Sequence, residues 1–523
     1  AITGFIDAPG GTTLGMGDDQ GNVVRDGGSI SADEKVDDAT DSTLELAFKN
    51  GIMTEETWAK RIGIDGFRFD LGVSLARLDG DFTKHHPFLY ALRSDLLLGN
   101  LKLIMEPWDL GPQGWRTGGF GMPFSEWNDR FRDTVRRFWI ADTQPGAPIG
   151  IGMQEMATRL CGSSDLFATE PGRGCVSSIN YVSCHDGFTL TDLTRYAVKH
   201  NEANGENNID GSNVNHSANF GVEGPSDDPA IIRKREQAAM NMLGTLMLSL
   251  GTPMMLAGDE FGNSQSGNNN AYAQDNDITW LNWDWIYQPR KTMQMHRLET
   301  VSRLLSIRKS LGLYHHEEFF TRLTQLGLFK PSSRVQWYLP DGTTPMDRDW
   351  FDTTIRSFAM RLLSQDEVDV LIVINGVDEV RRFTLPSDCS WQCDWSSATA
   401  VGLRPAPGDR LQRIGKNQAL RSNWIMSVSE KDNIHQLLKT VQASLAEQDK
   451  LDLLGATTEH ADVLFEDDEQ APGVGADVSA TMSAASTVHG ASASARDGGN
   501  ATVNGSVVWT MPALSISVMR RLQ

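Results

Sequence analysis

Three apolar segments of the chain lead into side chains that can act in acid–base or nucleophilic chemistry. The first reads Gly-Phe-Arg-Phe-Asp over residues 66–70. Side chains alternate faces along a strand, so Arg68 and Asp70 point the same way. The neighbouring arginine keeps the carboxyl group ionised, which suits a carboxylate nucleophile. A buried ion pair at a strand end explains this segment equally well.

The second segment, residues 103–109, is an apolar strand that ends at Glu106, after which Pro107 forces the chain out of the strand. A carboxyl group at the mouth of an apolar strand, beside an aromatic side chain such as Trp108, tends to have a raised pKa. A general acid requires such a pKa. For this segment alone, a turn with a capping acid is the favoured interpretation.

The third segment, residues 181–187, carries His185 and Asp186 after another short apolar stretch. A lone His-Asp pair is a weak motif that fits a metal site, part of a Ser-His-Asp triad or a hydrogen-bonded turn. The sequence offers no second histidine cluster and no Gly-x-Ser-x-Gly turn. Metal-dependent phosphohydrolase and serine hydrolase activities therefore have little support, and no metal site is predicted.

The combination of the three segments carries more information than any one of them. Catalytic side chains of parallel barrels gather at the carboxyl ends of the strands. Two carboxyl groups about 5–5.5 Å apart cleave a glycosidic bond with retention, and a third can stabilise the sugar cation. Trp108, Trp115 and Trp127 lie near these ends and could stack on sugar rings, although packing is the favoured interpretation for any single one.

These segments resemble conserved regions II, III and IV of the alpha-amylase superfamily of retaining glucan hydrolases. Within that superfamily the chain is more similar to the bacterial glycogen debranching enzymes and isoamylases. Four further motifs carry this likeness, at residues 123–129, 200–206, 251–262 and 267–281. The resemblance runs from about residue 62 to about 395 and resumes near 507–520.

The resemblance implies a role for each matching residue. Asp70 matches the nucleophile, Glu106 the acid/base, and Asp186 the carboxylate that stabilises the transition state. Arg68 and His185 match residues that hold the nucleophile and the sugar.

Trp108, beside the acid/base, is a further candidate for substrate binding. The implied substrate is an α-1,6 branch point in glycogen or its limit dextrin, and no cofactor is required. An α-1,4-acting amylase-like hydrolase or a trehalose-forming relative remains an alternative, although the motifs at 200–206 and 267–272 favour debranching.

The elements around these residues predict an α/β fold. Apolar strands are expected at residues 64–71, 101–105, 178–184 and 253–257, with helices over 127–141 and 229–250 between them. Such alternation indicates a parallel sheet, and the resemblance implies a (β/α)8 TIM-type barrel followed by a C-terminal antiparallel β-sandwich.

Three parts of the chain are predicted. Residues 1–53 are irregular or disordered apart from a possible helix at 41–49, and a helix begins at Thr54. Residues 54–330 form a partial catalytic β/α barrel. Residues 335–523 form the sandwich, with strands at 335–339, 356–362, 369–374 and 507–518. Residues 466–505, rich in Ala, Ser, Gly and Asp, are predicted to be a disordered insertion.

One expected motif is missing. Region I of the family, an Asp followed by Asn-His, should precede Gly66, but the first histidine of the chain is His85. Residues 1–63 are also too few for three βα units of roughly 30 residues each. The sequence thus predicts a barrel that lacks its first three strands, as in a truncated version of a longer enzyme. A non-catalytic glucan-binding or regulatory protein is the second hypothesis.

Composition narrows the choice of partners and compartment. The formal net charge of −21 argues against nucleic acid or an anionic membrane surface as a partner. The five cysteines are few and odd in number, which argues against a disulfide framework and favours a reducing compartment. A cytoplasmic protein that acts on a branched α-glucan is the resulting expectation.

Overall fold

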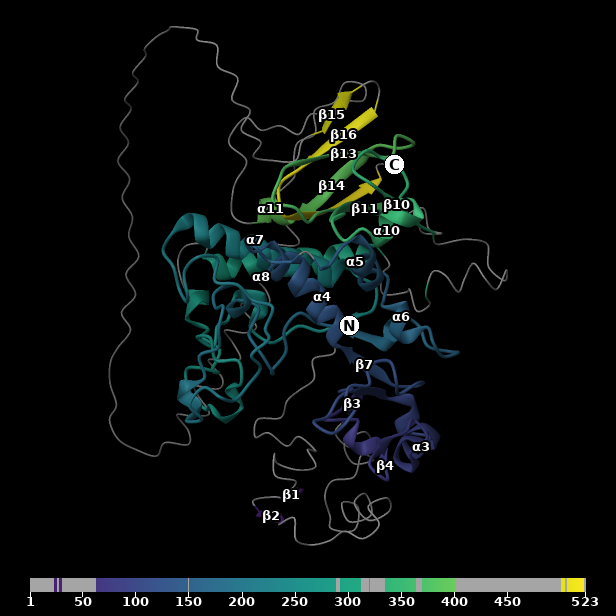
Figure 1. Ribbon diagram of the computed structural model, residues 1–523, viewed down its shortest axis with the longest axis vertical. Coiled ribbons are helices and arrows are strands. Elements are labelled where there is room, and N and C mark those ends of the chain that lie inside the picture. The colour runs from purple at the N-terminus through teal and green to yellow at the C-terminus, as the bar shows by residue number, and fades with distance from the viewer. Residues whose placement is uncertain are drawn as a thin grey trace, which may run out of the picture. The chain divides into compact units, whose positions relative to one another are not determined.

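The computed structural model describes residues 63–148, 150–287, 292–311, 319, 334–363, 369–400 and 506–521, with short strands at 23–25, 28–30 and 500–503 (Figure 1). The helices predicted at 41–49 and from Thr54 lie outside the described residues, as do most of 1–53 and 466–505. Strand β15 (Asn500–Val503) is the exception at the end of the latter segment. No helix in the described part of the chain is both long and apolar enough to cross a bilayer.

A parallel sheet carries the candidate residues. Within the described residues its strand order is β3-β6-β7-β8-β9, and every neighbouring pair is parallel. The strands are β3 (Gly66–Phe69), β6 (Lys102–Met105), β7 (Ser125–Asn128), β8 (Ser178–Asn180) and β9 (Thr252–Pro253). Their carboxyl ends share one edge of the sheet, so the groups that follow β3 and β6 become neighbours.

The prediction of a helix from residue 127 is wrong at its start, because residues 127 and 128 belong to strand β7. The helix predicted from residue 127 begins at Asp129 as α4 (Asp129–Trp139), and the four residues before it form a strand. The Asn128 side chain accepts the N–H of Phe131 at 2.9 Å, so Asn128 is the N-cap. Glu126 pairs with Met105 on one side and Ser178 on the other, and this pairing makes the segment a strand.

Helices connect the strands and cover the sheet. The longest helix among the described residues, α7, was predicted over 229–250 and spans Pro229–Leu248, with the Asp228 side chain accepting the N–H of Ala230. The others in this part are α3 (Pro87–Ser94), α5 (Met153–Leu160), α6 (Ser164–Phe167) and α8 (Met293–Ser310). Two small antiparallel pairs are β1 (Val23–Arg25) with β2 (Gly28–Ile30) and β4 (Arg77–Leu78) with β5 (Asp81–Phe82).

Two antiparallel sheets follow. The first has the order β10-β11-β12-β17-β14 and the second the order β13-β16-β15. Their strands are β10 (Arg334–Tyr338), β11 (Ser357–Leu363), β12 (Asp369–Asn375), β13 (Arg381–Thr384), β14 (Trp391–Ser396), β16 (Ser506–Met511) and β17 (Ser515–Arg521). Short helices α10 (Asp347–Phe351) and α11 (Ser397–Ala400) accompany them.

Strand β12 of the five-stranded antiparallel sheet is buried on both faces. Along β12, Ile372 and Ile374 belong to the core shared with α4, α7 and α8. Leu371 and Val373 belong to a second core that contains Phe383 of β13 and residues of β16. A strand covered on both sides needs an unbroken apolar run, which explains why this segment was predicted correctly.

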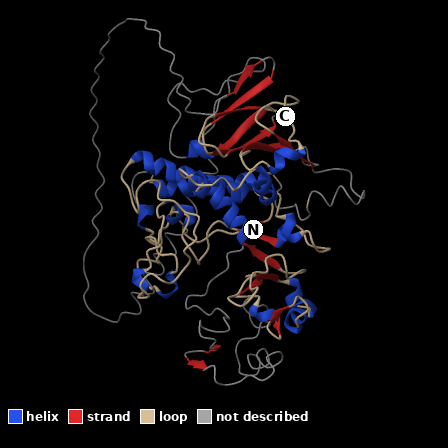
Figure 2. Ribbon diagram, in the orientation of Figure 1, coloured by secondary structure: helices blue, strands red, loops and turns tan. Residues whose placement is uncertain are grey.

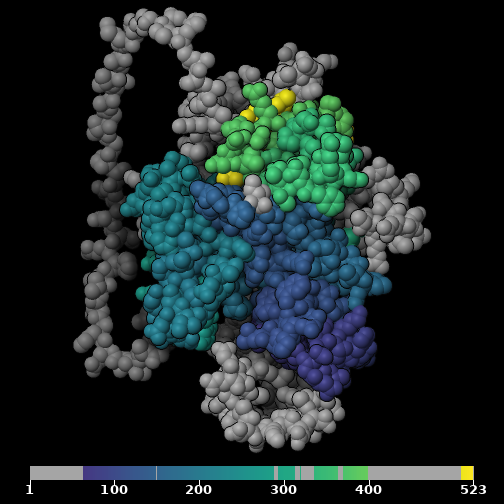
Figure 3. All heavy atoms as spheres, in the orientation of Figure 1, coloured from purple at the N-terminus to yellow at the C-terminus, as the bar shows by residue number. Residues whose placement is uncertain are grey.

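Helix α7 packs closely against the five-stranded antiparallel sheet. A Cβ atom at Gly244 would lie 2.7 Å from the Trp395 ring, so glycine permits the approach. Asn241 donates to the carbonyl of Leu514 at 2.7 Å. Figure 2 shows the blue helices beside the red strands, and Figure 3 shows the green region of the antiparallel sheets adjoining the teal and blue region of the helices. A parallel sheet with helices, followed by antiparallel sheets, agrees with the predicted α/β class, whereas the (β/α)8 barrel stays a prediction.

Candidate active site

Arg68 joins the first two candidate carboxyl groups. Its Nη1 forms an ion pair with Asp70, and its Nη2 lies 3.0 Å from Oε2 of Glu106. Arg68 of β3 and Asp70, which directly follows the strand, are in contact, as the alternation of side chains predicts. The contact with Glu106 follows from the parallel pairing of β3 with β6, in which Phe69 is the partner of Met105.

Glu106 is a buried carboxyl group with a raised pKa. Its side chain is 2% exposed, and its Oε2 accepts the N–H of Leu71 at 2.7 Å. Burial raises the pKa of Glu106 to about 7, against the opposing effects of the Arg68 charge and the Leu71 N–H. The charge of Asp70 and a side-chain hydrogen bond with it raise that pKa further. Near neutral pH this group can donate and accept a proton.

The backbone after Asp70 is strained. Leu71 has a φ of 42°, in the left-handed region that side chains with a Cβ atom rarely adopt. This conformation accompanies the Leu71 N–H bond to Glu106, while the Gly72 N–H donates to the Glu106 carbonyl at 2.9 Å. Such strain costs about 1–3 kcal/mol and persists where the surroundings fix it, often at functional sites.

His185 and Asp186 lie beyond β8, the strand of the third candidate segment. The strand predicted over 178–184 ends at Asn180, and both side chains sit on the following loop, 54% and 61% exposed. The Nε2 atom of His185 lies 3.5 Å from Oδ1 of Asp186. Among the described residues no contact joins Asp186 to Asp70 or Glu106.

The loop of Asp186 is held from two sides. The Gly187 N–H donates to the carbonyl of Asn269 at 2.9 Å. On the other side, the buried carboxyl group of Asp259 accepts the Ser183 hydroxyl and, at 2.9 Å, the Leu190 N–H. Burial raises the pKa of Asp259 to about 7.

Reciprocal hydrogen bonds join the motifs at 200–206 and 267–272. Asn201 donates to Oδ1 of Asn269 at 2.9 Å, and the Asn269 N–H returns a bond to Oδ1 of Asn201 at 2.9 Å. Both side chains are buried. Lys199 adds bonds from Nζ to the carbonyls of residues 209–211 at 2.6–3.1 Å. The motif at 267–272 therefore supports the loop that bears Asp186, through the carbonyl of Asn269.

The three tryptophans differ in exposure. Trp115 is 44% exposed and donates from Nε1 to Asp129 at 2.6 Å. Trp108 is half-buried, with its ring 6.3 Å from that of Trp127. Trp127 is only 7% exposed, and the Arg68 guanidinium lies 4.5 Å from its ring centroid. Sugar stacking by Trp127 does not fit this burial, whereas Trp108 stays a candidate.

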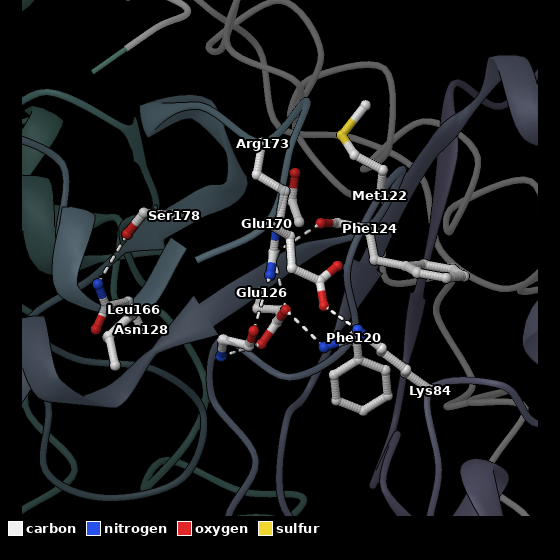
Figure 4. Close-up of polar contacts among 12 residues, drawn as sticks. Lys84, Phe120, Met122, Phe124, Glu126, Asn128, Leu166, Glu170, Arg173 and Ser178 are labelled. Atoms are coloured by element: carbon white, nitrogen blue, oxygen red, sulfur yellow. Dashed lines mark hydrogen bonds and ion pairs between the residues drawn. The ribbon is translucent and has the colours of Figure 1, made fainter. Parts of the chain in front are cut away.

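A buried ion pair that involves Glu126 of β7 was not predicted from the sequence. Glu126 and Arg173 are fully buried and 2.7 Å apart. Figure 4 shows Glu126 at the centre of this network, bonded also to the N–H of Phe120. A bond from the Gly118 N–H at 2.5 Å completes it. The pair fixes the loop between Glu106 and β7, and no local signal connects two residues so far apart in sequence.

No protein-family model matches the chain. Among curated relatives, the glycogen debranching enzyme of Serratia proteamaculans (strain 568) is 40% identical over 335 residues, which cover 64% of this chain and 46% of the relative. The glycogen debranching enzyme of Enterobacter sp. (strain 638) is 48% identical over 227 residues, covering 43% and 33%. The matched part of the chain is homologous to bacterial glycogen debranching enzymes. These identities confirm the resemblance of this part of the chain to bacterial glycogen debranching enzymes.

The chain spans about half the length of the first of these debranching enzymes. The glycogen operon protein GlgX homolog of Mycobacterium tuberculosis (strain ATCC 25618 / H37Rv) gives the same proportion, with 39% identity over 343 residues and 46% of its length covered. Among solved structures, pullulanase type I from Bacillus subtilis str. 168 complexed with maltose aligns with a TM-score of 0.44 and 20% identity, over 68% of this chain and 43% of that one.

Proposed function

We propose that this chain carries the cleavage site of a retaining glycoside hydrolase that acts on α-1,6 branch linkages of glycogen or its limit dextrin. The observation that carries the proposal is the placement of Asp70 and Glu106 directly after two neighbouring parallel strands and around one arginine, with the pKa of Glu106 raised to about 7. The names of the relatives, glycogen debranching enzymes, support the choice of linkage.

The proposed reaction has two steps. A carboxylate oxygen of Asp70 bonds to C1 of the branch glucose while the bond from C1 to the leaving oxygen breaks, and Glu106 protonates that oxygen. Glu106, now ionised, takes a proton from water, whose oxygen bonds to C1 as the bond to Asp70 breaks. Asp186 is assigned to stabilise the sugar cation, with His185 and Trp108 in contact with the sugar.

The proposal extends to the fold and the setting. The five described parallel strands are assigned to a (β/α)8 barrel, with the candidate groups at its carboxyl-end rim. The carboxyl groups carry the reaction, so no cofactor or metal is required. A branched α-glucan is the proposed partner, and the cytoplasm, where glycogen is stored, is the proposed location.

The test of this function is linkage analysis on β-limit dextrin from glycogen, with the whole chain as enzyme. We expect the α-1,6 anomeric proton signal to decrease while the α-1,4 signal stays constant, with release of short linear chains. Loss of the α-1,4 signal would instead identify an amylase-like hydrolase. Co-sedimentation with glycogen without any release of reducing ends would favour the glucan-binding alternative.

The pH dependence of the reaction should reflect the protonation state of Glu106. The first step needs Glu106 protonated, and its pKa is about 7, so kcat/KM should fall as the pH rises through about 7. The measurement is kcat/KM between pH 5 and pH 9 on the branched substrate. With α-maltotriosyl fluoride, whose leaving group needs no proton, the unsubstituted chain should lose this limb, and Glu106→Gln should keep residual activity. A limb that persists in the unsubstituted chain with the fluoride would assign it to another group.

A further inference from the structure

Trp127 touches groups from three strand ends, although it is too buried to face a sugar. It lies on β7 with Ile179 of β8 as its partner in the sheet. Its ring packs with Ile104, Ile179 and Tyr181 in a small core of its own. The exposed edge is only 7% of the residue, so a glucose ring has no open face on which to stack.

One contact of Trp127 is with the arginine of the site. The Arg68 guanidinium carbon is 4.5 Å from the indole centroid, within the range of a cation–π interaction. The same guanidinium pairs with Asp70 and Glu106. Within the described residues, the Nε and Nη2 atoms of Arg68 have no hydrogen bond of good geometry. The indole face thus supplies a favourable surface for a cation that is incompletely bonded.

A second contact of Trp127 is with the loop of the third carboxylate. The His185 ring stands edge-on to the indole with centroids 5.7 Å apart, and His185 lies 3.5 Å from Asp186. The rings of Trp108 and Tyr181 lie 6.3 Å and 5.7 Å away. One side chain therefore links Arg68, which orients two carboxyl groups, to His185, which precedes the third.

We propose that Trp127 is a positioning residue, whose indole holds the Arg68 guanidinium between Asp70 and Glu106 and aligns the His185 ring. The inference rests on the proposed function for its effect on catalysis. The contacts themselves are independent of that function. Trp127 acts through Arg68 and His185 and touches neither substrate nor the reacting atoms. Its loss should lower kcat by more than it raises KM, because Arg68 orients both reacting carboxyl groups, whereas His185 is only one of the groups assigned to the sugar.

The variants separate the π face from the volume of the side chain. Trp127→Leu removes the face and retains apolar bulk, whereas Trp127→Phe retains an aromatic face. The matched control is Trp391→Leu, because Trp391 is 4% exposed and has the Arg361 guanidinium 5.3 Å from its ring, in the separate core of the antiparallel sheets. We expect kcat to fall about 10- to 100-fold in Trp127→Leu, with recovery in Trp127→Phe and no change in Trp391→Leu.

An NMR measurement on the whole chain tests the contact between Trp127 and the Arg68 guanidinium without an activity assay. A guanidinium above an indole is shielded by the ring current, so the Arg68 Nε–Hε signal, assigned with Arg68→Lys, should lie upfield of other arginines. That shift should vanish in Trp127→Leu and partly return in Trp127→Phe. An unshifted Arg68 signal in the unsubstituted chain overturns the proposal, even if Trp127→Leu fails to fold.

The kinetic result distinguishes the positioning role from a sugar platform. A rise in KM at constant kcat in Trp127→Leu overturns the proposal, as does an equal loss of kcat in Trp391→Leu. If the unsubstituted chain cleaves no glucan, the proposed function fails, and the Arg68 signal alone decides whether Trp127 holds the guanidinium.

Discussion

Replacement of Asp70 by Asn is expected to reduce the rate of branch cleavage on the order of 10⁴-fold, with little change in stability. The amide has nearly the shape of the carboxylate but cannot form the ester bond to C1. Asp70 is 32% exposed, so the loss of its ion pair with Arg68 should cost little folding energy. The measurement is release of reducing ends from β-limit dextrin, with urea unfolding in parallel.

The control for this change is Asp65→Asn, which removes the same charge from an exposed position on the same segment. It should keep full activity. Unchanged turnover in Asp70→Asn would refute the assignment of the nucleophile. An equal loss in both variants would point to a general effect of charge.

Replacement of Arg356 by Ala should give the largest loss of stability, about 3–5 kcal/mol. Arg356 is 3% exposed and donates to the carbonyls of Ile151 at 2.8 Å and Gly376 at 2.9 Å, and also to that of Phe138. It thereby joins the start of β11 to the residues around α4. Its removal leaves buried carbonyl oxygens without donors and opens a cavity beside the Phe138 ring.

The midpoint of urea unfolding of the whole chain measures this effect. The matched control is Arg382→Ala on β13, an exposed arginine whose loss should change stability by less than about 0.5 kcal/mol. Arg356→Lys, which keeps the charge and fewer donors, should fall between the two. Equal midpoints for Arg356→Ala and Arg382→Ala would show that the junction does not limit stability.

The parts of the fold that the sequence predicted have a local cause. Strands β3 and β6 are short apolar runs that end at an acid, and β12 is apolar throughout because both of its faces are buried. Helix α7 begins with Asp228 and Pro229, which are strong start signals. Periodicity and capping can be read from neighbours in the sequence, so these elements needed no knowledge of the rest of the molecule.

The parts that the sequence missed depend on contacts between distant segments. Strand β7 reads Ser-Glu-Trp-Asn and has no apolar pattern, so its pairing with β6 and β8 alone makes it a strand. Residues 507–518, predicted as one strand, divide into β16 and β17 at a turn where Leu514 has a φ of 43°. Neither feature has a signal in neighbouring residues.

In the candidate site, too, some contacts follow from the local sequence pattern and others depend on pairing between distant segments. Alternation along β3 predicted that Arg68 and Asp70 share a face, and the structure has them in contact. The pairing of Arg68 with Glu106 depends on the register between β3 and β6, and the contact with Trp127 depends on β7. The predicted convergence of Asp186 on the same pocket stays a prediction, because its loop is held by Asn269 and Asp259 and not by the other two carboxylates.

Location of a covalent sugar on the protein tests the central claim most directly. A fluorinated α-maltotriosyl fluoride forms the glycosyl-enzyme through its good leaving group, while the ring fluorine slows hydrolysis of the ester. After digestion, mass spectrometry should find one maltotriosyl group on the peptide that contains Asp70, and none in Asp70→Asn. A label on a different carboxylate, or no label on the unsubstituted chain, would contradict the account.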